Sequence, residues 1–189
     1  MDLYMILLGA TPKGRLIEQH DLFFGIAPTL ADLQDDIDQA WAEADGNWHI
    51  DAYRKVRQVE QYQIKIIPKS QPKSCDKHLF LLNLGGYRPQ HFGEFHHTML
   101  IVADDLSQAI EIAKNSEFFQ SFSIDDSRAI SHIDNRYGVD IDDAFAVMDI
   151  LPSRFKTQYQ IDIIPMTDIQ AQADEIVLGY LPKKHLTTE

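Results

Sequence analysis

The sequence contains very little cysteine and little positive charge. One cysteine, Cys75, occurs in 189 residues, and the formal net charge is −12 at pH 7. A single cysteine excludes an internal disulfide framework, and its polar surroundings indicate an inert thiol in a linker. The acidic balance opposes the basic surface that nucleic acids and anionic membranes require, because Lys and Arg make most phosphate contacts. We therefore expect neither a nucleic acid nor a membrane as a partner.

The sequence also lacks long apolar segments and recognisable catalytic motifs. The apolar run from Leu3 to Leu8 is too short to span a membrane and follows an Asp rather than a basic region, so we expect a cytoplasmic protein. The loops at residues 10–15 and 86–93 contain Gly and Pro, but we expect them to join strand to strand, which excludes phosphate loops that need a following helix. No nucleophile motif is present. The sequence therefore leaves open whether the protein is an enzyme.

The sequence does contain one block that is used twice. Leu3–Gly9 and Glu18–Ala27 return, 76 positions later and without a gap, as Leu79–Gly85 and Glu94–Ala103. The identical positions are Leu3 and Leu79, Leu8 and Leu84, Gly9 and Gly85, Glu18 and Glu94, His20 and His96, Ala27 and Ala103, and Leu30 and Leu106. A constant offset over two segments indicates an internal duplication.

A later segment extends the match in the same order. Gln61–Pro68 returns as Gln158–Pro165, and the two differ only where Lys65 is replaced by Asp162. An accidental match would not continue in order along the chain. We therefore expect these two segments to be equivalent strands.

A third match lies between the others and has two versions. His49–Val56 returns as His132–Val139, which keeps a His, an Ile, an Asp and a Val in register. A rival version places residues 50–54 on residues 124–128 and keeps only Ile, Asp and Arg. We prefer the first version because it preserves more residues, and it implies an insertion around residues 115–131.

Hydrophobic periodicity predicts the elements of each copy. In the first copy, Leu3–Leu8 is apolar on both faces, as in a central strand, and Glu18–Ala27 follows as the second strand of a hairpin. Apolar residues at helical spacing predict a helix over residues 29–46, and two further strands are expected over 48–59 and 62–67. One copy is therefore β-β-α-β-β.

These elements predict an α+β fold with mostly antiparallel sheet. The copies are expected at residues 1–68 and 78–165, with a C-terminal extension at 166–189, all in one compact two-repeat unit. In the second copy, Asp105 is the predicted N-cap of the equivalent helix, and a short helix is expected over Asp142–Leu151. The acidic residues around its start are more typical of a helix N-terminus than of a calcium loop.

Polar pairs recur inside the predicted strands. Residues two apart in a strand share a face, so Glu18 and His20 point together, as do His49 and Asp51. If their strands are neighbours, two imidazoles and two carboxylates meet, which is a ligand set that suits Zn, Mn or Fe(II). The candidate metal ligands of the two copies are Glu18, His20, His49, Asp51, Glu94, His96, His132 and Asp134.

The recurring segments resemble a known family. Leu-Tyr-Met-Ile-Leu-Leu-Gly at the start, the doubled Glu-x-His, Trp-His-Ile-Asp, Leu-Asn-Leu-Gly-Gly-Tyr and the ending Leu-Gly-Tyr are similar to the bacterial family called domain of unknown function 1543. The resemblance covers nearly the whole chain, and the doubled Glu-x-His is its most specific part. It implies an arrangement of one or two copies per chain, and it brings no assigned activity or catalytic residue.

Three classes of function are compatible with these residues. The Glu-x-His and His-x-Asp pairs predict a binder of a divalent metal such as Zn or Mn, or of an unidentified small-molecule ligand. The alternative is a non-catalytic structural or oligomerising module, such as a homodimer, in which each pair is a hydrogen-bonded network that satisfies buried charge. General acid and base catalysis by the same groups is the third class.

Overall fold

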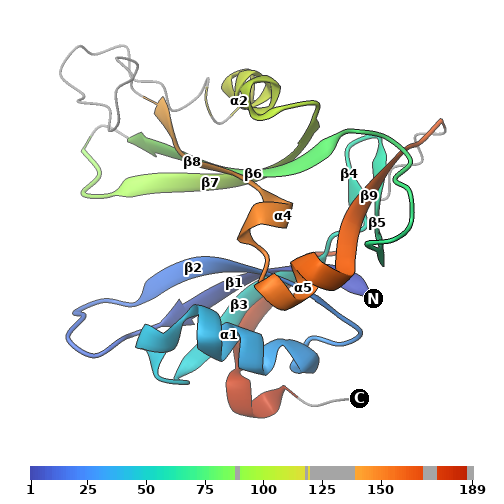
Figure 1. Cartoon of the computed structure of the whole chain (residues 1–189). Coiled ribbons are helices and arrows are strands. Elements are labelled where there is room, and N and C mark those ends of the chain that lie inside the picture. Colours follow the sequence, from blue (N-terminus) through green and yellow to red (C-terminus); the bar gives the residue numbers. More distant parts are fainter. Residues whose placement is uncertain (88–89, 118, 120–138, 168–173, 187–189) are drawn as a thin grey trace. The chain divides into compact units, whose positions relative to one another are not determined.

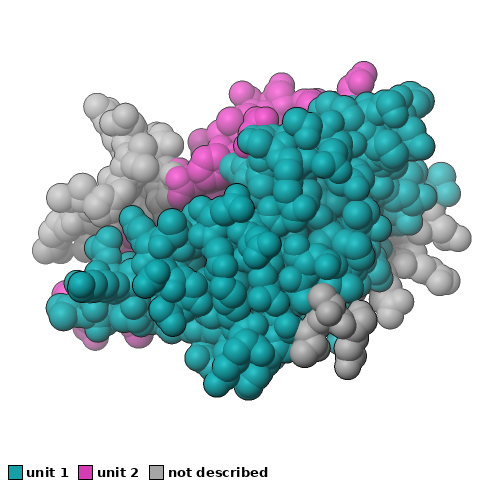
Figure 2. All heavy atoms as spheres, turned by 60° about the horizontal axis from the view of Figure 1, so that its bottom comes forward, with its two compact units in different colours: residues 1–75, 150–189 teal, residues 76–149 magenta. Residues whose placement is uncertain are grey.

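The computed structural model describes residues 1–87, 90–117, 119, 139–167 and 174–186 (Figure 1). This part of the chain forms mostly antiparallel sheets with a few short helices, an α+β fold as the sequence predicts. It divides into two compact units, residues 1–75 together with 150–189, and residues 76–149 (Figure 2). These limits differ from those expected for the repeats, because the segment after residue 149 joins the first unit. No described helix is long and apolar enough to cross a membrane.

A four-stranded antiparallel sheet forms the body of the first unit. Its strands, in the order β10-β3-β1-β2, are β1 (Asp2–Ala10), β2 (Gln19–Ala27), β3 (Trp48–Lys55) and β10 (Val177–Pro182). β1 is apolar on both faces and is paired on both sides, by β2 and β3, as expected for a central strand. β10 comes from the C-terminal extension and contributes an edge strand.

A helical segment covers one face of this sheet (Figure 1). It consists of the 3-10 turn η1 (Ala31–Leu33), α1 (Gln34–Ala40) and the 3-10 turn η2 (Ala42–Ala44). The segment lies close to β2 because Gly25 has no side chain: a Cβ there would lie 2.6 Å from Leu33 Cδ2. The single helix predicted over residues 29–46 is wrong in its interior, since the backbone leaves helical geometry at Trp41, with φ −122° and ψ 61°.

The starts of the helices follow local signals in the sequence. The backbone N–H and the hydroxyl of Thr29 both donate to the Asp32 carboxylate, at 3.1 and 2.7 Å. In the second unit, Asp105 is the N-cap of its helix and accepts a hydrogen bond from the backbone N–H of Gln108 at 2.9 Å. The N-cap predicted at Asp105 is therefore confirmed.

A smaller sheet in the first unit contains the two matched tail segments. Its strands, in the order β4-β5-β9, are β4 (Gln58–Val59), β5 (Tyr62–Pro68) and β9 (Tyr159–Pro165), and the short helix α5 (Ser153–Gln158) leads into β9. Both tails are strands, and they pair with each other. Lys65 lies opposite Asp162 at the middle of this antiparallel pair.

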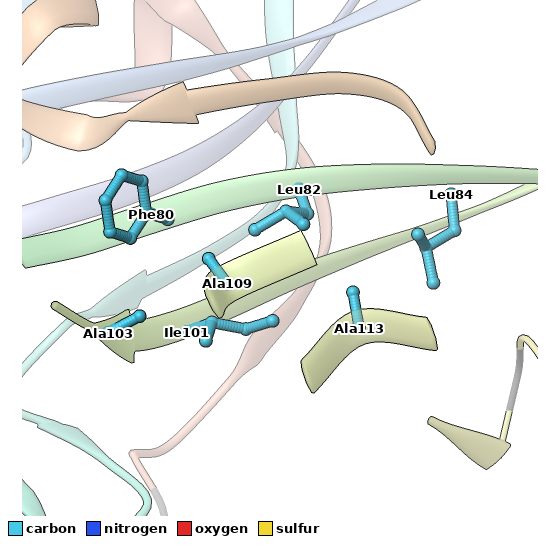
Figure 3. Close-up of a cluster of buried hydrophobic side chains, with 7 residues drawn as sticks. All are labelled: Phe80, Leu82, Leu84, Ile101, Ala103, Ala109 and Ala113. Atoms are coloured by element: carbon cyan, nitrogen blue, oxygen red, sulfur yellow. The ribbon is translucent and has the colours of Figure 1, made fainter. Parts of the chain in front are cut away.

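The second unit is a three-stranded antiparallel sheet with one helix on it. Its strands, in the order β7-β6-β8, are β6 (His78–Tyr87), β7 (Glu94–Ala103) and β8 (Val139–Ala146). The helix is α2 (Leu106–Lys114), and its alanines pack against the sheet. Figure 3 shows the buried side chains of this core, which are Phe80, Leu82, Leu84, Ile101, Ala103, Ala109 and Ala113.

The segment before Pro152 differs from its prediction. A helix was expected over Asp142–Leu151, but residues up to Ala146 form β8, and only α4 (Val147–Ile150) is helical. Pairing with β6 decides the conformation here, because a short segment next to an open strand edge gains a full ladder of hydrogen bonds. The acidic residues at its start therefore belong to a strand rather than to a helix N-terminus.

The hairpins of the two units have the same register. Asp2 faces Ala27 in the first hairpin, and His78 faces Ala103 in the second. Both residues of the second pair therefore lie 76 positions after their counterparts in the first. In each unit the third strand pairs with the other edge of the central strand. The offset found in the sequence is thus also present in the strand pairing.

Candidate functional site

The strand register of the first unit brings four of the predicted site residues together. Gly9, near the end of the central strand, faces His20 of β2 on one side and His49 of β3 on the other. Directly paired residues of neighbouring strands project to the same face of a sheet. The two imidazoles therefore flank Gly9, with Glu18 directly before β2 and Asp51 on β3.

Gly9 provides the space for these side chains. A Cβ at this position would lie 2.4 Å from His49 Nε2 and 2.6 Å from Asp51 Oδ2, which is far inside contact distance. The strand was expected over Leu3–Leu8, but β1 continues through Gly9 to Ala10. Glycine is required here for close approach of the polar groups to the backbone.

A β-bulge on β3 shapes the position of Asp51. Against β1, the pairing steps from Leu7 with Ala52 to Leu8 with Ile50, so Asp51 has no partner residue. Such a bulge bends the strand and re-aims the side chain at that point. The alternation of residues along the strand did not predict this bulge, although it correctly predicted that Asp51 projects to the same side as His49.

The four side chains meet in a ring of alternating imidazoles and carboxylates. His20 Nε2 lies 3.4 Å from Glu18 Oε2 and 3.2 Å from Asp51 Oδ2. His49 Nε2 lies 3.3 Å from Glu18 Oε1 and 3.2 Å from Asp51 Oδ1. Each carboxylate thus faces both imidazoles, one oxygen to each ring.

Exposure changes from one side of this ring to the other. The side chain of His49 is 9% exposed and that of Asp51 is 28% exposed, whereas Glu18 and His20 are 44% and 47% exposed. The aromatic ring of Tyr180 lies against the His49 imidazole, with 4.3 Å between centroids. A solute can therefore approach the ring from the side of Glu18 and His20.

One atom of the ring is left without a hydrogen bond. Asp51 Oδ2 is buried and has no hydrogen-bond partner among the described residues, although His20 Nε2 is close to it. An unsatisfied buried acceptor costs about 1–3 kcal/mol, and more when it is charged. A proton, a water molecule or a cation would remove this cost.

The four groups as placed are not a finished metal site. Within the described ranges, no group of three or more His, Cys, Asp or Glu side chains is already arranged to hold a metal ion. The imidazole nitrogens lie 3.2 to 3.4 Å from the carboxylate oxygens, so imidazoles and carboxylates face each other in pairs. A metal would have to replace these pairs, and the exposed Glu18 and His20 are the members with room to move.

A salt bridge fixes the surroundings of His49. Lys183, in the 3-10 turn η3 (Lys183–His185) after β10, pairs with Asp38 of α1 at 2.5 Å, and Trp48 Nε1 donates to the same carboxylate at 2.7 Å. Burial would raise the pKa of Asp38, but the hydrogen bonds from Lys183 and Trp48 outweigh burial and lower it. The start of β3 and the end of β10 are thereby tied to α1.

The second unit has the same glycine position with different neighbours. Glu94 and His96 lie on β7, with His96 Nε2 3.6 Å from Glu94 Oε2. Gly85 of β6 faces His96 on one side and Asp140 of β8 on the other. Asp140 thus takes the register position that His49 has in the first unit.

This register corrects the match between the third strands. The pairing of β8 with β6 shifts between Asn83 and Leu84, the positions equivalent to Leu7 and Leu8, and leaves Asp142 where Asp51 stands. The sequence match had placed His132 and Asp134 there; both lie outside the described residues. The match implied by the strand register, residues 49–56 with 140–147, keeps an Ile, an Asp and a Val but no His, which is why the match at residues 132–139 was preferred.

A cavity lies elsewhere in the first unit. Its volume is about 300 Å³, and it is lined by Leu22, Phe23, Phe24, Asp36, Gln39, Ala40, Ile150 and Pro152. Asp36 is buried and paired with Arg154 of α5, and this hydrogen bond raises the pKa of Arg154. Because the carboxylate is already occupied by the guanidinium, the cavity offers a ligand mainly apolar contact.

Comparison with known proteins supports the fold and gives no activity. The model of the family described as Domain of Unknown Function (DUF1543) matches residues 15–66, the segment that contains Glu18, His20, His49 and Asp51. The crystal structure of a protein Il1583 from Idiomarina loihiensis is similar over 96% of each chain, with a TM-score of 0.63 and 19% identity. No curated protein matches the chain.

Proposed function

We propose that this protein binds a divalent metal ion, such as zinc or manganese, through Glu18, His20, His49 and Asp51. The observation that carries the proposal is the buried oxygen of Asp51, which has no hydrogen bond in a ring of two imidazoles and two carboxylates. Zinc takes His nitrogen and carboxylate oxygen as ligands, and a half-exposed ring gives it a path of entry.

The spacing of the ring supports the proposal. Its N–O distances are 3.2 to 3.4 Å. Two ligands of a tetrahedral zinc ion, with bonds of about 2.0–2.2 Å, lie about 3.3–3.5 Å apart. A metal needs neutral imidazoles as ligands, so that binding weakens at acidic pH, where protons compete for the same nitrogens.

Thermal unfolding with and without zinc or manganese tests the proposal. A bound metal should stabilise the parent protein by about 2.7 kcal/mol at a free concentration one hundred times the Kd. The His20→Ala variant should lose most of this effect, and because His20 is half-exposed its fold should be retained. His185→Ala, a change at an exposed histidine outside the ring, is the matched control and should respond like the parent.

A structural role is the second candidate, and the closed ring of ion pairs favours it. Each carboxylate already lies 3.2 to 3.4 Å from both imidazoles, and the described residues contain no ready-made metal site. In this case His20→Ala should lower the melting temperature by exposing an uncompensated carboxylate, and metals should change nothing in the parent. The same titration therefore separates the two functions.

We also propose that the two units are copies of one ancestral unit. The equal hairpin registers, the bulge at equivalent positions and the glycine in each central strand support this. When the two units are superposed, β1, β2 and β3 should lie on β6, β7 and β8 with bulge on bulge. A different register in either sheet would refute the duplication.

A further inference from the structure

The C-terminal strand β10 adds a residue to the ring that the Glu-x-His and His-x-Asp pattern does not contain. The Tyr180 ring lies 4.3 Å from the His49 imidazole, between centroids, with 40° between the planes. Tyr180 is itself 70% exposed, whereas the His49 side chain is 9% exposed. One face of the aromatic ring therefore covers the imidazole while the other is in contact with solvent.

The backbone of β10 is shaped to place Tyr180 there. Leu178 pairs with Ala52 and Leu181 pairs with Ile50, so Gly179 and Tyr180 together oppose Asp51 alone. Gly179 has φ +139°, a conformation that other residues rarely adopt. This second bulge turns the strand at the level of the ring, directly opposite the bulge that places Asp51.

We propose that Tyr180 is a positioning residue of the metal site: its aromatic ring fixes the plane of the His49 imidazole and keeps water from the imidazole face that it covers. Tyr180 touches the ligand and does not itself coordinate the ion. The expected effect of Tyr180 on metal affinity rests on the proposed metal binding. The expected effect on His49 itself rests only on the contact between the Tyr180 ring and the imidazole. Residues that orient a metal-binding histidine typically change metal affinity by about 10–100-fold.

Zinc affinity, measured by competition with a chromophoric chelator, tests the positioning role. Tyr180→Ala should bind zinc at least about tenfold more weakly than the parent. Tyr180→Phe should bind like the parent, because the ring rather than the hydroxyl contacts His49. Leu178→Ala, at an exposed side chain of the same strand, is the control for damage to β10 and should also bind like the parent. Equal zinc affinity of Tyr180→Ala and the parent would overturn the role.

A second measurement works without metal. The rate of carbethoxylation of each histidine by diethyl pyrocarbonate is followed by mass spectrometry in the metal-free protein. Tyr180→Ala should raise the rate at His49 several-fold and leave the rate at His185 unchanged, whereas Leu178→Ala and Tyr180→Phe should change neither. If the parent fails to bind zinc but His49 becomes reactive in Tyr180→Ala, the metal proposal fails and the covering of His49 by Tyr180 stands. An unchanged His49 rate would refute the covering.

Discussion

The two units share one backbone arrangement, but different polar residues flank the central glycine in each. In the first unit, Gly9 of the central strand is flanked by His20 and His49. The corresponding residues of the second unit are Gly85, His96 and Asp140. Since the second unit forms the same register and the same bulge without a histidine on its third strand, the fold itself does not require His49. On the proposed function, His49 is present as a metal ligand and not as a requirement of the strand pairing.

The two units also differ in how many imidazoles and carboxylates occupy the equivalent positions. The ring of the first unit has two imidazoles and two carboxylates, whereas the register positions of the second unit contain one histidine, with acidic residues in the others. Imidazole favours zinc, and carboxylate favours magnesium, calcium and manganese. On the proposed function, zinc belongs to the first unit.

Filling the space at the central glycine should have the largest effect. Gly9→Ala would place a methyl group 2.4 Å from His49 Nε2, so that the side chains of the ring must move apart. Overpacking of this kind costs about 1–3 kcal/mol. Urea denaturation should show this loss in the free energy of unfolding, and the variant should no longer bind zinc.

Gly93→Ala is the matched control for this change. A Cβ at Gly93 would have no atom within 4 Å, so its free energy of unfolding should equal that of the parent. If Gly9→Ala had the same free energy of unfolding as Gly93→Ala and still bound zinc, the arrangement of the four side chains would not depend on Gly9. The occurrence of glycine at both Gly9 and Gly85 would then have no structural explanation.

Replacing the third-strand histidine by the residue of the second unit should have the next largest effect. His49→Asp gives the first unit the residue that Asp140 provides in the second. Zinc affinity should fall by more than about tenfold, which corresponds to about 1.4 kcal/mol. Manganese affinity should change much less, because carboxylate oxygen suits manganese. A parallel loss of both metals would indicate damage to the fold rather than a change of preference.

The sequence predicted the features that depend on neighbouring residues. The two hairpins, the N-cap at Asp105 and the shared face of Glu18 and His20 all follow from turn residues, capping side chains and alternation. These features are encoded within a few residues of where they occur. The ring was expected only if the strand of Glu18 and His20 lay beside the strand of His49 and Asp51. In the structure β1 lies between these two strands, and the side chains meet over Gly9 instead.

The features that were missed depend on distant partners. Asp142–Leu151 looks helical by itself, and pairing with the open edge of β6 makes its first half, up to Ala146, a strand. Tyr180 reaches His49 through a strand that pairs from the far end of the chain. The third-strand match failed because the register is set by a bulge, and a bulge leaves no pattern in side-chain alternation.

The pair β5 and β9 shows how the proposed duplication was accommodated. Equivalent residues of the two tails face each other at Lys65 and Asp162, the only position at which the tails differ. Two lysines directly opposite would repel each other. Asp162 is buried and accepts hydrogen bonds from the backbone N–H and the hydroxyl of Ser74, at 2.6 and 2.8 Å. On the proposed duplication, the two tails differ where two lysines would have faced each other.

The smallest expected effect concerns the tether of β10, the strand of the first unit that bears Tyr180. Asp38 is joined to Lys183 and Trp48, which lower the pKa of Asp38, so its contribution is present above the unfolded pKa of about 3.9 and is lost as pH falls through the lower folded value. Because the pair is partly exposed, Asp38→Asn should cost less than about 1 kcal/mol at pH 7. The difference in free energy of unfolding between the parent and Asp38→Asn should shrink as pH is lowered from 5 to below about 3. A difference that stayed constant over this range would mean that the tether acts through packing of Trp48 and not through charge.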